Sequence, residues 1–229
     1  MGRNFMKEKE NETLTDEKSG NIIPFGAVRG HGGIITVTII GQVEGHYLLP
    51  ETQKTTKYEH VLPLLASAEQ DENVKGIIVM INTVGGDVEA GLAIAEMLAG
   101  MKTPTVSIIL GGGHSIGLPI AVACKKSFAV PSATLTIHPV RISGTVLGVP
   151  QAFASLEKMQ ERVSGFIVGH SRIKRDVLDG LMMNTGELTT DVGSVISGEE
   201  AIKIGLIDEL GGIADAFSAV RSMAEKKLK

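Results

Sequence analysis

The chain has 229 residues and a net charge of −4, which suits one sizeable domain and argues against a surface for binding nucleic acid. Aromatic residues make up only 3% of the sequence and include no tryptophan, so a platform for stacking bases is not expected either. The single cysteine, Cys124, excludes an internal disulfide and belongs to no metal-binding pattern, and it fits an intracellular, cytoplasmic protein.

Local composition indicates how the chain is organised. Residues 1–20 are polar and charged and lack the apolar core of a signal peptide, so we expect a disordered tail followed by one domain at 21–229. Residues 104–124 carry no formal charge and could suggest a membrane span. Because glycines 111–113 and Pro119 divide this stretch into two short apolar pieces, we expect a buried strand, a turn and a buried helix, and no membrane span.

Strands and helices are predicted to alternate along most of the chain. Apolar, β-branched runs predict strands at 33–41, 75–82, 105–110, 126–130 and 134–138. Helical spacing predicts helices at 58–70, 87–100 and 115–124. Glycine turns are expected at 83–86 and 111–113. Strands that are almost continuously apolar and alternate with helices are typical of a mainly parallel sheet covered on both faces, so the fold class is α/β.

The second half of the chain is predicted to be helical. A long amphipathic helix is expected at 149–172 and a second helical segment at 173–183. The long helix has an apolar stripe formed by Phe153, Leu156, Met159, Val163, Phe166 and Ile167. A helix of this length is too long for a small core to cover, so we expect it to contact a neighbouring subunit in a homo-oligomer. Ser197 followed by Glu200 predicts a capped helix start, and two short elements are expected to close the chain.

The pentapeptide Gly-His-Ser-Ile-Gly at 113–117 contains the first candidate catalytic residue, Ser115. A serine between an apolar strand and an apolar helix would lie at a helix N-terminus, where backbone N–H groups can meet a developing oxyanion. The alternative is that Ser115 is only an N-cap residue. The spelling G-x-S-x-G also suggests an α/β-hydrolase elbow, but that fold needs a later histidine than His138 or His170, so we reject it.

His138 and the tandem glycines Gly85 and Gly86 are the other candidate site residues. His138 ends an apolar strand, and catalytic side chains of parallel sheets gather at such strand ends. A lone histidine there could be structural, but together with Ser115 it is expected to act as a general base. The glycines either present N–H groups to an anion or form a plain strand-to-helix turn. No G-x-G-x-x-G sequence follows the first strand, which excludes a dinucleotide site of that type.

In this order, the motifs resemble the proteolytic subunit of Clp proteases. The resemblance rests on Gly85-Gly86, residues 113–117, Ile137-His138-Pro139, residues 197–201 and Gly205-Leu206-Ile207-Asp208, and covers about residues 34–211. Within that family the chain most resembles the translocation-enhancing protein branch. The resemblance implies the ClpP and crotonase-like fold, a Ser-His-Asp triad and peptide or unfolded-protein substrates. It also implies an oxyanion hole from the N–H groups of Gly86 and Ile116, and a protruding handle helix at 149–172 that joins stacked rings.

The sequence departs from the family pattern at two places. Only residues 26–33 separate Phe25 from the first strand, so the family's first helix is missing and docking to an ATP-driven unfoldase is in doubt. Counting back from Ser197 without a gap places Gly193 at the position of the triad acid, and the nearest carboxylate is Asp191. The acid is therefore expected to be Asp191, with Glu187 or no carboxylate at all as the alternatives.

These observations predict a serine peptidase in which Ser115 is the nucleophile, His138 the general base and Asp191 the acid that orients it. No metal and no organic cofactor are expected. Two other function classes stay open. One is a non-catalytic scaffold or chaperone-like relative with a broken triad. The other is a crotonase-type acyl-CoA enzyme, although we find no basic residues placed for the nucleotide of coenzyme A.

Overall fold

The structure is a computed structural model that describes residues 22–23, 26–186 and 192–227. The tail expected at 1–20 lies outside the described residues, and so do both candidate acids, Glu187 and Asp191. Of the helices in the described part of the chain, none combines the length and the apolar character needed to cross a membrane.

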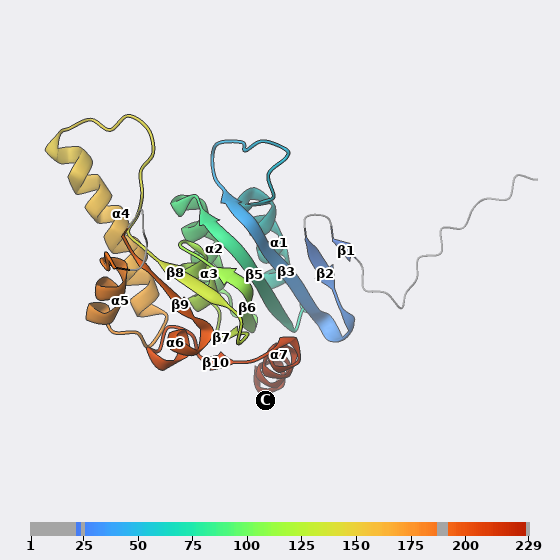
Figure 1. The fold of residues 1–229 in the computed structure, drawn as a ribbon. Coiled ribbons are helices and arrows are strands. Elements are labelled where there is room, and N and C mark those ends of the chain that lie inside the picture. Colours follow the sequence, from blue (N-terminus) through green and yellow to red (C-terminus); the bar gives the residue numbers. More distant parts are fainter. Residues whose placement is uncertain (1–21, 24–25, 187–191, 228–229) are drawn as a thin grey trace, which may run out of the picture.

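A mainly parallel sheet forms the centre of the molecule and runs in the order β1-β2-β3-β5-β6-β7-β10 (Figure 1). Its strands are β1 (Ile22–Ile23), β2 (Ala27–Arg29), β3 (Ile34–Glu44), β5 (Gly76–Gly86), β6 (Thr105–Gly113), β7 (Lys126–Ala129) and β10 (Glu209–Leu210). Strands β3, β5, β6, β7 and β10 are parallel, and the short strand β4 (Thr55–Lys57) extends this arrangement beside β3. At one edge of this sheet, the described strands β1 and β2 are added antiparallel. The predicted α/β class and the predicted parallel sheet are confirmed.

Helices cover both faces of the sheet. On one face lie α1 (Tyr58–Gln70), α2 (Val88–Gly100) and α3 (Gly117–Val122), whose fully buried side chains include Leu65, Ile94 and Ile120. The predictions of helices at 58–70 and 87–100 are confirmed almost to the residue. Helix α7 (Ile213–Lys227) covers the other face with Ala216 and Val220. The expectation of two short closing elements is therefore wrong, because α7 is 15 residues long and buries that second apolar face.

Strands β5 and β6 continue through the glycines that were expected to form turns. Strand β3 runs on to Glu44, and its residues Gln42 and Val43 pair with Gly85 and Gly86, so the strand pairing continues there although both glycines have a positive φ. The ladder between β5 and β6 is interrupted between Ile81 and Thr83. At that point Oδ1 of Asn82 accepts a hydrogen bond from the Gly112 N–H at 2.9 Å. A side chain thus replaces the missing backbone bond where the two strands approach the site.

A second, smaller sheet carries His138 at the end of one strand. Strand β8 (Thr134–Ile137) pairs antiparallel with β9 (Ser194–Ser197) and meets β6 at Gly112. Helix α6 (Gly198–Lys203) follows β9. Ser197 caps it: its hydroxyl accepts from Glu200 N–H, and the Glu200 carboxylate accepts from Ser197 N–H. The predicted capping box is confirmed.

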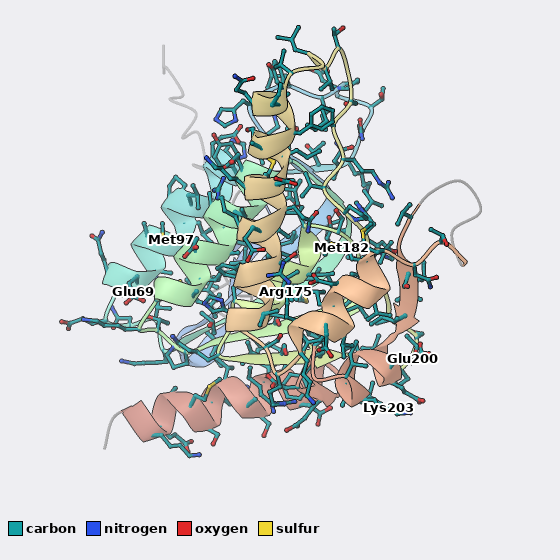
Figure 2. All side chains as sticks on the ribbon, turned by 90° about the vertical axis from the view of Figure 1, so that its left-hand side faces the viewer. Glu69, Met97, Arg175, Met182, Glu200 and Lys203 are labelled. Atoms are coloured by element: carbon teal, nitrogen blue, oxygen red, sulfur yellow. The ribbon has the colours of Figure 1, made fainter. Side chains whose placement is uncertain are left out.

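The N-terminal half of the long helix α4 (Pro150–Gly169) projects from the rest of the molecule, and α5 (Arg175–Met182) lies beside its C-terminal half (Figure 2). Arg175 joins the two helices because its guanidinium bonds to Glu161 on α4 and to Asp179 on α5. Phe166 and Ile167, in the last turns of α4, are buried in the main core. Phe153, near the other end of α4, is 62% exposed. The domain therefore covers only part of the predicted apolar stripe.

Candidate active site

Ser115 lies in a strained turn between β6 and α3. Its φ of 55° is the only positive φ of a non-glycine residue in the described chain, and such a conformation costs about 1–3 kcal/mol. The backbone of Ser115 itself is held by two bonds: Ser115 N–H donates to the Thr136 carbonyl, and Leu118 N–H donates to the Ser115 carbonyl, both at 2.9 Å. The N-cap of α3 is Ile116, so the alternative that Ser115 is only an N-cap residue is wrong.

His138 directly follows β8 and is half-buried. Its Nδ1 lies 2.7 Å from the carbonyl oxygen of Pro139. A carbonyl can only accept, so Nδ1 carries the proton in this bond and Nε2 of the neutral ring is left as an acceptor. That tautomer is the one a general base needs. The ring is thus oriented by the backbone of the next residue.

A pocket of about 310 Å³ brings the candidate residues together. Gly86, the adjacent pair Ser115 and Ile116, and His138 come from three separate segments, and all of them line it. Gly85 also lines it and lies so close that a Cβ added there would be 2.7 Å from the Cβ of Ser115. The rest of the wall is largely apolar and includes Val88, Leu118, Val163, Ile167 and Met182. The carboxyl ends of β5, β6 and β8 thus form one site, as expected for parallel strands.

The geometry of this site is not that of a closed triad. Among the described residues, the Ser115 hydroxyl forms no hydrogen bond, and no carboxylate bonds to His138. Gly193, which takes the family's acid position by count, lies directly beside His138. The two candidate acids, Glu187 and Asp191, lie outside the described residues. Nor do the side chains of the described part of the chain include a cluster of three or more groups suited to a metal ion.

His114, the neighbour of Ser115, is a feature that the sequence reasoning missed. Its Nδ1 shares a 2.8 Å hydrogen bond with the hydroxyl of Thr136 on β8. Burial lowers the pKa of His114 below its usual 6.5, and the nearby His138 lowers the pKa further. The sequence does carry a signal for this contact. Side chains two residues apart along a strand point to the same side, so Thr136 lies on the side of β8 where His138 meets the turn with His114 and Ser115.

An ion pair anchors α4 across the pocket. The Arg162 guanidinium donates two bonds to the Glu89 carboxylate on α2, at 2.5 and 3.0 Å. Hydrogen bonds from Arg162 hold the pKa of Glu89 below its usual value. The residue after Arg162, Val163, and the residue before Glu89, Val88, both line the pocket. Because both charged groups are about half exposed, the pair fixes the geometry more than it adds stability.

Comparison with known proteins agrees with this fold. A sequence profile of the Clp protease family matches residues 35–213. The chain is 54% identical to "Translocation-enhancing protein TepA" of Halalkalibacterium halodurans, over 83% of this chain and 75% of that protein. It is 28% identical to "ATP-dependent Clp protease proteolytic subunit 1" of Chlamydia muridarum, over 62% of this chain and 71% of that protein. The chain belongs to the Clp protease family.

Proposed function

We propose that the chain is a serine peptidase that hydrolyses peptide bonds, with Ser115 as nucleophile and His138 as general base. The observation that carries this proposal is the pocket of about 310 Å³ onto which both residues open. Holding a serine at a φ of 55° lowers the stability of the folded chain, and such strained residues are concentrated at functional sites. A purely structural serine would have no need for that conformation.

In the first step, the Ser115 oxygen would attack the carbonyl carbon of a peptide while Nε2 of His138 takes the hydroxyl proton. The tetrahedral intermediate collapses to an acyl-enzyme, and His138 returns the proton to the leaving amine. Water then attacks the acyl group with His138 again as base, which releases the acid product and restores the serine. Ring rotation or a small shift of the turn must first bring the serine hydroxyl within about 3 Å of Nε2.

The backbone N–H groups of Gly86 and Ile116 are the proposed oxyanion hole, and both residues line the pocket. Asp191 remains the proposed acid. For it to accept from Nδ1 of His138, the present bond from Nδ1 to the Pro139 carbonyl has to be exchanged for a bond to the carboxylate. The Pro139 carbonyl would then act as the resting partner that keeps the correct tautomer.

We propose peptides and unfolded proteins as the substrates, and a homo-oligomeric ring as the assembly. The exposed Phe153 on the projecting half of α4 supports a contact between subunits, since a large exposed apolar side chain is typical of an interface. The one cysteine, Cys124, is a buried free thiol, which fits action in the reducing cytoplasm.

The test is hydrolysis of unfolded casein and of a small fluorogenic peptide by the purified protein. The Ser115→Ala variant should lose several orders of magnitude in rate, and a fluorophosphonate should label the wild type but not this variant. Ser132→Ala, which changes an exposed serine beyond β7, is the matched control and should behave like the wild type. Activity of Ser115→Ala within tenfold of the wild type would contradict the mechanism.

A non-catalytic scaffold or chaperone-like protein is the second candidate. It is favoured by the backbone bond of His138 Nδ1 and by Gly193 at the counted acid position. The same experiment separates the two, because a scaffold would neither hydrolyse casein nor react with the fluorophosphonate. It would instead slow the aggregation of an unfolded protein equally well with and without Ser115→Ala.

A further inference from the structure

Two hydrogen bonds connect the nucleophile turn to the strand that carries the general base, and both end on Thr136. We infer that His114 and Thr136 form a clamp that positions Ser115 relative to His138, an inference that rests on the proposed peptidase function. The clamp consists of the bond between His114 Nδ1 and the Thr136 hydroxyl and of the bond from Ser115 N–H to the Thr136 carbonyl. Both members are positioning residues, since neither has to touch the substrate.

The two halves of the site need such a connection because they belong to different sheets. Ser115 follows β6 of the main sheet, whereas His138 follows β8, which is paired over four residues with β9. Among the described residues, the ladder between β6 and β8 consists of the single pair Gly112 and Thr134. Without further bonds, β8 could shift against β6 and change the separation of the nucleophile from the base.

Thr136 is well placed to prevent this shift. It lies two residues before His138 on β8, so any displacement of Thr136 along the strand moves His138 as well. Its carbonyl accepts from Ser115 N–H at 2.9 Å, and its hydroxyl bonds to His114 at 2.8 Å. One residue therefore holds the backbone of the nucleophile and the side chain that precedes it.

The His114 ring packs directly over Gly112. A Cβ on Gly112 would lie 2.5 Å from Nε2 of His114, so the ring occupies the space that a side chain at position 112 would need. Gly112 itself is held by the side chain of Asn82. On the other side, His114 N–H donates to the Thr83 carbonyl of β5 at 3.2 Å. Residue 114 is thus bound to β5 through its backbone and to β8 through its imidazole, which packs over Gly112 of β6.

The protonation state of His114 suits this role. Burial and the neighbouring His138 both lower the pKa of His114, so its ring is neutral at neutral pH. In the proposed reaction His138 becomes positively charged each time it takes the serine proton. A charged His114 would oppose that step by Coulomb repulsion, whereas a neutral ring can hold the turn without raising the barrier.

Three substitutions on β8 test the clamp. Thr136→Val keeps the shape but removes the hydroxyl, and it should lower kcat by about tenfold to 100-fold, the range expected when catalytic groups are slightly misplaced, with KM changed less than about twofold. Thr136→Ser restores the hydroxyl and should recover most of kcat. Thr134→Val changes an exposed threonine of the same strand and should leave both constants unchanged.

A double-substitution cycle gives a second measurement that does not depend on one variant. His114→Ala should lower kcat by a factor similar to that of Thr136→Val, and the double variant should lose no more than the larger single loss, because both changes remove the same bond. Sedimentation and thermal unfolding of each variant verify that assembly and fold are retained. If Thr136→Val does not fold, the single variants Thr136→Ser and His114→Ala still test the clamp, because the first should keep most of kcat and the second should lose it.

The outcomes separate the clamp from the proposed function. An active wild type with Thr136→Val equal to it, or with Thr136→Ser as impaired as Thr136→Val, overturns the clamp alone. Fully additive losses in the double variant overturn it too, since they mean that the two side chains act independently. A wild type that neither hydrolyses peptides nor reacts with a fluorophosphonate overturns the peptidase function, and the catalytic role of the clamp with it.

Discussion

Gly193 lies against the backbone of His138, and a Cβ added to it would come within 2.8 Å of the Cβ of His138 and would collide with the Ile137 carbonyl oxygen. Its φ of 138° is also a region that side chains rarely adopt. The counted position of the triad acid is thus one that this backbone reserves for glycine. A carboxylate on Gly193 itself would displace the histidine that it should orient.

The first prediction concerns this contact. Gly193→Ala should lower the free energy of unfolding by about 1–3 kcal/mol, because it adds strain at a positive φ and pushes on His138. Peptide hydrolysis should fall as well. Gly100→Ala is the matched control, since a Cβ at Gly100 on α2 meets no atom within 4 Å, and chemical denaturation gives both values. Equal stability of the two variants would contradict this prediction, because it would show that the backbone before β9 accommodates the Cβ without loss of stability.

The second prediction concerns the acid. Asp191→Asn should lower kcat by at least about 100-fold, because an amide cannot stabilise the charged form of His138, whereas Glu187→Gln should stay close to the wild type. Steady-state kinetics on a fluorogenic peptide measure both. If neither variant differs from the wild type, the Pro139 carbonyl is the permanent partner of His138 and the site works as a dyad.

The third prediction concerns assembly. Phe153→Glu places a charge on the projecting half of α4, so a subunit contact that covers this position should be lost. Sedimentation should show the wild type far above 24.1 kDa and the variant closer to that mass. Ser155→Glu adds the same charge at an exposed position of the same helix and is the control. A wild type that sediments as a monomer would contradict the proposed assembly.

The fourth prediction concerns acid stability. The pKa of His114 is lower in the folded chain than its ordinary 6.5, so below that pH the unfolded chain binds more protons and stability falls as the pH is lowered. His114→Gln removes this titration and should reduce the loss of stability between pH 7.5 and 5.5. Denaturation midpoints at fixed protein concentration measure it, with exposed His46→Gln as the control. The same pH dependence in His114→Gln and wild type would exclude His114 as its source.

Much of the fold could be predicted because the decisive signals are local. Alternation of apolar strands and helices indicated the parallel sheet, and Ser197 with Glu200 marked the start of α6 to the residue. The glycines at the ends of β5 and β6 misled in a specific way. They were expected to form turns, but pairing with β3 keeps Gly85 and Gly86 within strand β5, and pairing partners far along the chain are not visible in a local pattern.

The candidate site was also partly predictable from local sequence and partly decided by the tertiary structure. The residue types and their order along the chain were enough to single out Ser115 and His138, because a serine among glycines and a histidine at a strand end are local features. Tertiary structure decided that both open on one pocket, that Ser115 adopts a φ of 55°, and that Nδ1 of His138 bonds to the next carbonyl. These features depend on the position of β8 relative to β6. That position is set by contacts between residues more than twenty apart in the sequence, such as the hydrogen bond between His114 and Thr136.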